Sequence, residues 1–149
     1  ESSMGPHRGG TNIYRLEGKY RCNKGQVFLA RTPEDSRVVV KVILKSEVHC
    51  PFGIEEINRE CAFLSTLTHP SIARGLEILH STEKIHIIME CAGIRTLEQH
   101  CKAKPDCRLP EDEANEVVTQ IADALAFMHQ GDFAHRSVSL HHVVVRPRP

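Results

Sequence analysis

The sequence lacks net charge, long apolar runs and paired cysteine motifs. Lysine plus arginine and aspartate plus glutamate number 19 each, so no overall charge draws the chain onto nucleic acid or an anionic membrane. No run approaches the roughly 20 apolar residues of a membrane helix, and residues 1–10 lack the apolar core of a secretory signal. The sequence therefore predicts an intracellular chain, cytoplasmic or within a cytoskeletal or other complex, that neither binds nucleic acid nor inserts into membranes.

The cysteines and histidines show no spacing typical of metal ligands or disulfides. The six cysteines form no CxxC pair, which favours free thiols. The ten histidines lie close to one another or to cysteines only as sequence neighbours, and adjacent residues rarely complete a tetrahedral site without a second spaced pair. We therefore expect structural or surface roles for these side chains, and no metal.

The 149 residues, 40 % of them apolar, are enough for one hydrophobic interior. Residues 1–12 combine glycine, proline, serine and histidine without apolar periodicity, which predicts a disordered leader. Short segments rich in β-branched and aromatic residues follow, with turn-prone stretches between them. They predict antiparallel strands at residues 13–17, 25–31, 37–44, 74–80 and 84–91.

Apolar residues recur at helical spacing in two longer segments. The first predicts a helix over residues 54–67. The second predicts a helix over residues 111–129, with Pro110 and three acids at its favourable N-terminal end. A shorter helix is expected within residues 94–105, and a short strand at residues 143–145.

Two charged residues interrupt these apolar patterns. Strand alternation points Lys41 to the same face as Val39 and Ile43, and helical periodicity places Glu60 inside the apolar stripe of its helix. Each charge would be largely desolvated there, and burying an unpaired charge is costly. Two arrangements remain open: an ion pair that joins the sheet to the helix, or two side chains that each reach solvent at a rim.

Several motifs occur in a fixed order along the chain. They are VVVK at 38–41, a glutamate 19 positions later at Glu60, THPSI at 68–72, IMECAG at 88–93 and LAFMHQGDFAHRSVSLHHVVV at 125–145. In this order they resemble the protein kinase domain, from its first strand to just past its catalytic loop, and its Ser/Thr branch most nearly. The resemblance favours the Lys41–Glu60 ion pair, because the family pairs its VAIK lysine with a glutamate of the following helix.

The resemblance implies an α+β, protein-kinase-like fold. We expect a five-stranded antiparallel N-lobe sheet with one packed helix over residues 13–91, then a hinge and the first helices of a truncated helical C-lobe over residues 92–149. Gly75 stands where the family has a spine residue, which indicates a weakness in the internal stack. In a complete kinase a larger lobe encloses the helix at residues 111–129. We therefore expect a protein partner, or a continuation of the polypeptide, to cover its apolar stripe.

The positions of the family's catalytic and metal-binding residues depart from the family pattern. Ser137, Ser139 and His142 stand where the family has its catalytic aspartate, loop lysine and metal-binding asparagine, and the family's Asp-Phe-Gly does not appear. A hydroxyl does not accept a proton as a carboxylate does, and imidazole is a poor ligand for Mg²⁺. The departures imply an inactive, pseudokinase-like scaffold or regulatory subunit. The alternatives are a divergent or truncated ATP-binding Ser/Thr kinase and a regulator that binds ATP without turnover.

A nucleotide-binding pocket can persist in a chain that lacks the residues for phosphoryl transfer. By resemblance, its residues would be Lys41, Glu60, Gly25, Val27, Val39, Met89, Glu90 and Ala92. Two features oppose binding: Tyr20 and Cys22 replace glycines of the phosphate loop, and Val39 replaces the alanine above the adenine. We therefore expect no required cofactor, and the alternative is ATP binding without a complete magnesium site. Without a ligand, Lys41 and Glu60 only dock the helix on the sheet.

Overall fold

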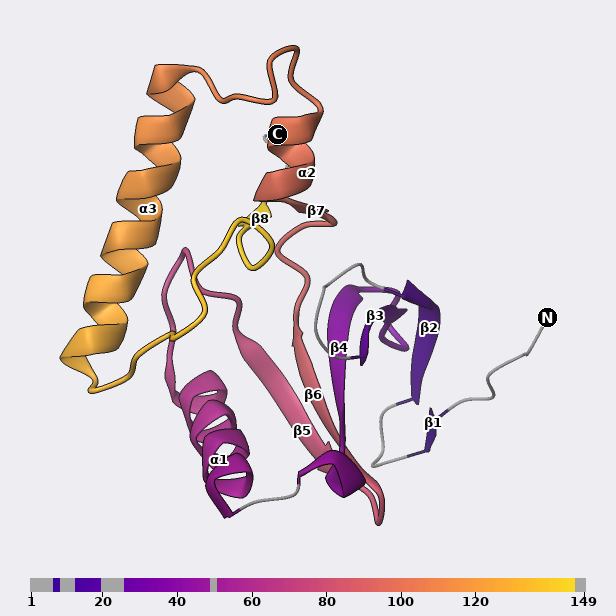
Figure 1. Ribbon diagram of the computed structural model, residues 1–149. Helices are drawn as coiled ribbons and strands as arrows, with labels where there is room; N and C mark the ends of the chain where they lie inside the picture. Colours follow the sequence, from indigo (N-terminus) through magenta and orange to yellow (C-terminus); the bar gives the residue numbers. More distant parts are fainter. Residues whose placement is uncertain (1–6, 9–12, 20–25, 49–50, 147–149) are drawn as a thin grey trace. The chain divides into compact units, whose positions relative to one another are not determined.

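The computed structural model describes residues 7–8, 13–19, 26–48 and 51–146 (Figure 1). Contacts divide the chain into two units, which are described separately below. The first unit comprises Glu1–Leu67 and Arg74–Cys91, and the second comprises Thr68–Ala73 and Ala92–Pro149. The segment 68–73 therefore groups with the second unit, although the sequence placed it within the first lobe.

The first unit holds a six-stranded antiparallel sheet with the strand order β1-β2-β3-β4-β6-β5. The strands are β1 (His7–Arg8), β2 (Ile13–Lys19), β3 (Gln26–Arg31), β4 (Arg37–Leu44), β5 (Gly75–His80) and β6 (Lys84–Glu90). Strands β2 to β6 confirm the five predicted strands. The predicted disordered leader is wrong at His7 and Arg8, because the open edge of β2 offers main-chain groups that pair without apolar side chains.

The sheet has two apolar faces, as strand alternation requires. One face carries a cluster built on Ala30, Val38, Val40 and Ile88. The other face carries Ile85 and Ile87, which pack with Leu64 of helix α1 (Pro51–Thr66). A short 3-10 helix, η1 (Lys45–Glu47), follows β4. The predicted helix at residues 54–67 is therefore α1, and it covers only one of the two faces.

Gly75 allows α1 to approach β5 closely. A Cβ atom at this position would lie 2.5 Å from the carbonyl oxygen of Leu64 and 2.7 Å from the Leu64 Cβ atom. No side chain fits at such distances, so only glycine is compatible with this packing. The prediction that Gly75 marks a weakness in the internal stack is wrong, because the helix backbone and Leu64 occupy the space of the absent side chain.

The second unit contains two short paired strands and two helices. Its elements are β7 (Arg95–Thr96), α2 (Leu97–Lys102), α3 (Glu111–Gln130) and β8 (Val144–Val145). Strands β7 and β8 pair antiparallel, and Thr96 begins α2 with a capping box that it shares with Gln99. The rings of His69 and Phe127 lie 5.0 Å apart. These elements confirm the predicted helices and the short C-terminal strand.

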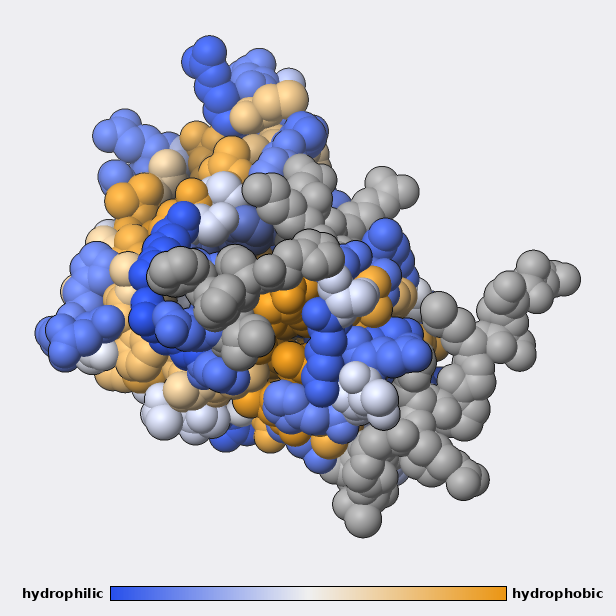
Figure 2. All heavy atoms as spheres, turned by 60° about the horizontal axis from the view of Figure 1, so that its bottom comes forward, coloured by the Kyte–Doolittle hydropathy of each residue, from blue (hydrophilic) through white to orange (hydrophobic). Residues whose placement is uncertain are grey.

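Large apolar side chains are exposed in both units. Leu76 is exposed in the first unit, and Ile94, Val118, Val138 and Leu140 are exposed in the second. Figure 2 shows hydrophobic side chains at the surface among hydrophilic ones. Across the part of the chain that the structure describes, no helix combines the length and apolar content that a membrane crossing needs.

Candidate functional site

Lys41 of β4 and Glu60 of α1 form the ion pair that the sequence favours. Lys41 Nζ lies 2.6 Å from Glu60 Oε1 and 2.9 Å from Glu60 Oε2, so the ammonium donates to both carboxylate oxygens. The side chains of Lys41 and Glu60 are 30 % and 38 % exposed, respectively. The two charges, expected to be largely desolvated, are therefore partly desolvated, because long side chains bury their stems and leave their head groups near water. At this exposure the pair contributes on the order of 1 kcal/mol to docking α1 on the sheet.

Three apolar candidates share the sheet face of Lys41. The strand register places Val27 opposite Lys41 and Met89 opposite Val39, and such cross-strand partners point to the same side of a sheet. Val27 is buried, while Val39 and Met89 are half-buried. An ammonium therefore lies beside an apolar surface, a combination that suits both the base and the phosphates of a nucleotide.

The hinge candidates are divided between the units. Glu90 ends β6 in the first unit, and its N–H group donates to the Arg74 carbonyl at 2.8 Å. Ala92 is half-buried in the second unit, next to Gly93, where a Cβ atom would collide with the carbonyl oxygen of Val145. The phosphate-loop positions lie outside the described residues: Tyr20, Cys22 and Gly25.

Ser137, Ser139 and His142 come together in one turn of the second unit. His142 Nδ1 lies 2.6 Å from the Ser137 carbonyl oxygen, 3.3 Å from Ser137 Oγ and 3.2 Å from Ser139 Oγ. The main-chain N–H of His142 also donates to the Ser139 carbonyl at 3.0 Å. The three positions that depart from the family pattern therefore form one hydrogen-bonded cluster, the 137–142 cluster.

The shortest contact in this cluster fixes the tautomer of His142. A carbonyl oxygen only accepts, so His142 Nδ1 carries the hydrogen that it donates to Ser137. This nitrogen is therefore not a base that takes a proton from either serine hydroxyl. Among the described residues, no carboxylate hydrogen-bonds to Ser137, Ser139 or His142. The geometry suits a structural turn and differs from a nucleophile activated by a base.

The backbone before the cluster makes a tight bend. Arg136 has a φ of 58°, a left-handed conformation that non-glycine residues seldom adopt. The Ser137 N–H group donates to His135 Nδ1 at 3.3 Å across this bend. Sequence reasoning missed the role of the Arg136 backbone, because no periodicity or residue preference signals a positive φ at an arginine.

The start of α2 supports the region that contains the cluster. The N–H groups of Leu97 and Glu98 donate to the carbonyls of Val143 and Leu140, at 2.8 and 3.1 Å. Glu98 also lies 2.7 Å from Lys102 Nζ and 2.9 Å from His141 Nδ1. The hydrogen bond from Lys102, aided by His141, lowers the pKa of Glu98. The chain on either side of His142 is therefore anchored to α2 by main-chain and side-chain bonds.

The described histidines, cysteines and carboxylates form no metal site. Within the described ranges, no three histidine, cysteine, aspartate or glutamate side chains gather as metal ligands. The described cysteines are free thiols, and burial, reinforced by the Glu60 charge, raises the pKa of Cys61. The expected free thiols are confirmed for Cys61, Cys91, Cys101 and Cys107.

Comparison with known proteins agrees with this arrangement. The model of the protein kinase domain family matches residues 21–146. CBL-interacting protein kinase 4 of Oryza sativa subsp. japonica is 35 % identical over 139 residues, which cover 87 % of this chain and 31 % of that protein. NUAK family SNF1-like kinase 2 of Rattus norvegicus is 31 % identical over 130 residues, covering 87 % and 20 % of the two chains. Aurora kinase B of Drosophila melanogaster is 29 % identical over 143 residues, covering 95 % and 40 %. The match thus spans less than half the length of each relative.

Proposed function

The chain belongs to the protein kinase domain family, in its serine/threonine branch, and from this premise we propose that it is catalytically inactive and acts by binding. In this proposal it is a pseudokinase-like scaffold or regulatory subunit. The 137–142 cluster carries the proposal. Phosphoryl transfer needs a group that orients the acceptor hydroxyl and ligands for the metal. The cluster offers two hydroxyls and an imidazole whose Nδ1 is engaged with a carbonyl.

The expected size of the loss in reaction rate supports the proposal that the chain is inactive. A positioned general base contributes about 10²–10⁴ to a rate, and a serine at position 137 cannot supply that contribution. An imidazole at position 142 is also a poor substitute for oxygen ligands of Mg²⁺. The two changes affect different requirements of the same reaction, so neither compensates for the other.

A second candidate function is that of a divergent or truncated ATP-binding Ser/Thr protein kinase. The Lys41–Glu60 pair beside Val27, Val39 and Met89 favours it, since these residues suit a nucleotide. We propose instead that the pair serves to dock α1 on the sheet. In this view no cofactor is required, and any ATP binds without a complete magnesium site.

Thermal unfolding with nucleotide separates these functions. The melting temperature would be measured with ATP and with ADP, each with and without Mg²⁺, because a ligand that binds only the folded state raises its stability. We expect no shift and no phosphate transfer with Mg²⁺ or Mn²⁺. A shift without transfer that Lys41→Met abolishes would indicate a nucleotide-binding regulator. Transfer abolished by Lys41→Met, but kept in the control Lys45→Met, would refute the inactive assignment.

We further propose that a protein partner, or a continuation of the polypeptide, covers helix α3. Ala124 and Met128 are buried, but Val118 on the same helix is 63 % exposed. Among the described residues, four of the five exposed large apolar side chains lie in this second unit. Exposed apolar surface of this kind usually marks an interface when it is contiguous.

An apolar dye tests the covering of α3. We expect the chain to bind the dye, Val118→Lys to reduce the dye signal, and the neighbouring control Thr119→Lys to leave it unchanged. A monodisperse monomer with no dye-accessible patch would contradict the proposal.

We also propose that the chain works inside the cell, in the cytoplasm or in a cytoskeletal or other complex, without binding nucleic acid. The equal numbers of acidic and basic residues support this, because nucleic-acid binding depends on a cationic surface. Filter binding of labelled DNA and RNA at low salt is the test, and retention that disappears at high salt would contradict it.

A further inference from the structure

The sheet of the first unit is strongly curled. Tyr14 of β2 donates a hydrogen bond to Glu77 Oε2 of β5 at 2.6 Å, although β3, β4 and β6 lie between these strands. In a flat sheet, four strand spacings of about 4.8 Å would place β2 and β5 about 19 Å apart. Two side chains cannot bridge that distance at their ends. The face that carries Tyr14 and Glu77 is therefore concave.

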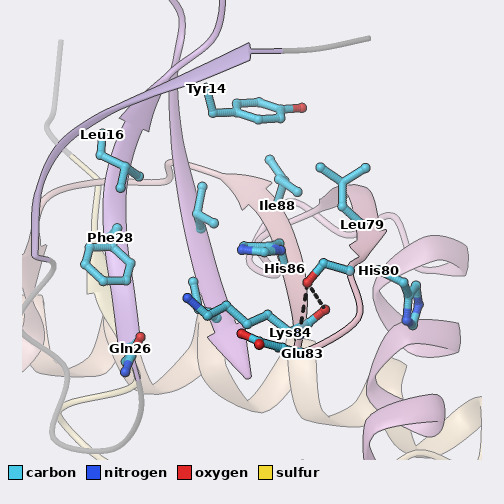
Figure 3. Close-up of a pocket in the computed structure, with 13 residues that line it drawn as sticks. Tyr14, Leu16, Gln26, Phe28, Leu79, His80, Glu83, Lys84, His86 and Ile88 are labelled. Atoms are coloured by element: carbon cyan, nitrogen blue, oxygen red, sulfur yellow. Dashed lines mark hydrogen bonds between the residues drawn. The ribbon is translucent and has the colours of Figure 1, made fainter. Parts of the chain in front are cut away.

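A pocket of about 250 Å³ lies in this concave face (Figure 3). Apolar side chains from β2, β4 and β5 line it, among them Leu16, Val42 and Leu79. Strand alternation points Lys41 to the other face of β4, and helix α1 also packs on that other face. The pocket is therefore separate from the Lys41–Glu60 pair.

Aromatic rings from β2, β3 and β6 also line the pocket. They belong to Tyr14, Phe28 and His86, and Figure 3 shows all three among the lining side chains. Each of these residues is half-buried, so part of its surface remains for a ligand to cover. Aromatic rings attract one another by offset stacking and by edge-to-face contacts, beyond the apolar area that they bury. The lining therefore favours a planar aromatic ligand.

The charges around the pocket balance. Among the described residues that line it, Lys84 supplies one ammonium and Glu83 one carboxylate. Lys19 pairs with Phe28 in the strand register and so shares this face, where Glu77 supplies a second carboxylate. Equal numbers of the two charges attract neither an anion nor a cation. A charged ligand would also lose its hydration among the apolar walls, so the pocket favours an uncharged one.

The size of the pocket limits the ligand to two fused rings. A cavity of about 150 Å³ lined by apolar side chains binds benzene, which is a single ring. The pocket volume of about 250 Å³ leaves room for a second ring, but it lies below the range of about 300–1,000 Å³ that is usual for drug and cofactor sites. The bond between Tyr14 and Glu77 crosses the concave face at one end of the pocket, so an extended peptide cannot run through it. A free small molecule therefore fits better than a peptide.

We infer that this concave pocket binds a small uncharged molecule built from two fused aromatic rings. The ligand lies among the rings of Tyr14, Phe28 and His86, and the side chains of Val42 and Leu79 complete its apolar surroundings. Indole has this size, shape and charge, and it serves as the probe. The inference goes beyond the proposed function, because it requires neither the nucleotide candidates nor the 137–142 cluster.

Methyl NMR of the whole chain, labelled at isoleucine, leucine and valine, tests the inference at about pH 8, where an ordinary imidazole is neutral. We expect saturable shifts of the Val42, Leu79 and Ile88 methyl groups with indole. Phenol should bind about tenfold more weakly, since it lacks the second ring. Indoleacetate and tryptamine carry opposite charges on the same ring system. Each should bind at least about tenfold more weakly than indole, because its charged group must be desolvated or left without a partner.

A short peptide distinguishes a free molecule from the side chain of a partner protein. Acetyl-Gly-Trp-Gly-amide presents the same two rings on a main chain, and we expect it to bind more weakly than indole. Tighter binding of this peptide would assign the pocket to a protein partner and overturn the inference.

Variants that fill the pocket complete the test. Val42→Phe places a larger side chain in it and should weaken indole binding by at least about tenfold. The matched control is Val118→Phe, the same substitution at an exposed position of α3, which should leave binding unchanged. If Val42→Phe does not fold, as judged by circular dichroism, Leu16→Trp replaces it and should weaken binding in the same direction. Three further results would overturn the inference: no saturable shifts with indole, equal or tighter binding of phenol or of either charged analogue, or unchanged binding in the filled variant.

Discussion

The sheet face under α1 and the 137–142 cluster keep different parts of the family pattern. On the sheet, Lys41 meets Glu60 at 2.6 Å beside apolar strand residues. In the cluster, the positions of the family's chemical groups carry Ser137, Ser139 and His142, which hydrogen-bond to one another. The ion pair joins a helix to a sheet, so it has a structural reason to persist without catalysis. A lysine–glutamate ion pair of this kind therefore does not by itself indicate catalytic activity. The 137–142 cluster is more informative about activity.

The largest expected effect concerns the architecture of the first unit. Gly75→Ala places a Cβ atom 2.5 Å from the Leu64 carbonyl oxygen, so α1 must move away from β5. We expect the free energy of unfolding to fall by about 2–3 kcal/mol, as for other overpacked sites. Denaturant unfolding is the measurement. The control is Gly18→Ala, because nothing lies within 4 Å of a Cβ atom there. Similar losses in both variants would show that close helix packing is not the cause.

The next effect separates the structural role of the ion pair from a catalytic one. Lys41→Met and Glu60→Gln should each lower the free energy of unfolding by about 1 kcal/mol in the absence of nucleotide. A double-mutant cycle measures their coupling, and we expect the double variant to lose less than the sum of the single losses. Strictly additive losses would mean that the two groups do not stabilise each other, and that the pair has no docking role.

A smaller effect concerns the cluster. His142→Ala removes the donor to the Ser137 carbonyl and should lower the free energy of unfolding by about 0.5–1 kcal/mol. His142→Asn keeps an N–H donor at this position and should lose less. Chemical unfolding of both variants provides the comparison. If the alanine and asparagine variants lose equal stability, the hydrogen bond to Ser137 is not what holds the turn.

Sequence periodicity was sufficient to predict the regular strands and helices. Alternation along β4 and helical spacing along α1 placed Lys41 and Glu60 on the apolar faces of their elements, and the family resemblance then favoured their pairing. The structure shows the pair, and the register places Val27, Val39 and Met89 on the face of Lys41. The degree of burial of Lys41 and Glu60 could not be predicted from the sequence. Periodicity gives the direction of a side chain, but it does not give the depth at which the charged group lies.

Other features depend on geometry that no local pattern encodes. The bond between Tyr14 and Glu77 joins residues 63 positions apart and requires the curl of the whole sheet. The contact of His142 with Ser137 depends on a positive φ at Arg136, a residue type that rarely adopts one. The role of Gly75 depends on how closely α1 approaches β5. The resemblance pointed to the positions in the loop, but their mutual hydrogen bonds came only from the structure.

The smallest expected effect tests whether the second unit is held together by ordinary ion pairs away from its loop. Glu113, in the first turn of α3, lies 2.9 Å from Lys104 Nζ and 2.6 Å from His100 Nε2. The hydrogen bond from Lys104, followed by that from His100, lowers the pKa of Glu113 below its ordinary value of 4.5. The folded state therefore favours the carboxylate, and the resulting stability is present above pH 4.5 and is lost as the pH falls through the lowered pKa.

Glu113→Gln removes this contribution, so its melting temperature should fall less than that of the wild type between neutral pH and acid pH. Glu111→Gln is the matched control, since Glu111 lies in the same helical turn and forms no ion pair with any described residue. Its melting temperature should follow the wild-type pH dependence. If Glu113→Gln also follows it, the bonds to Lys104 and His100 do not stabilise α3. The stability of the second unit would then depend on its apolar contacts, such as the burial of Ala124 and Met128. The 137–142 cluster would then be supported by the polar contacts of α2 and not by those of α3.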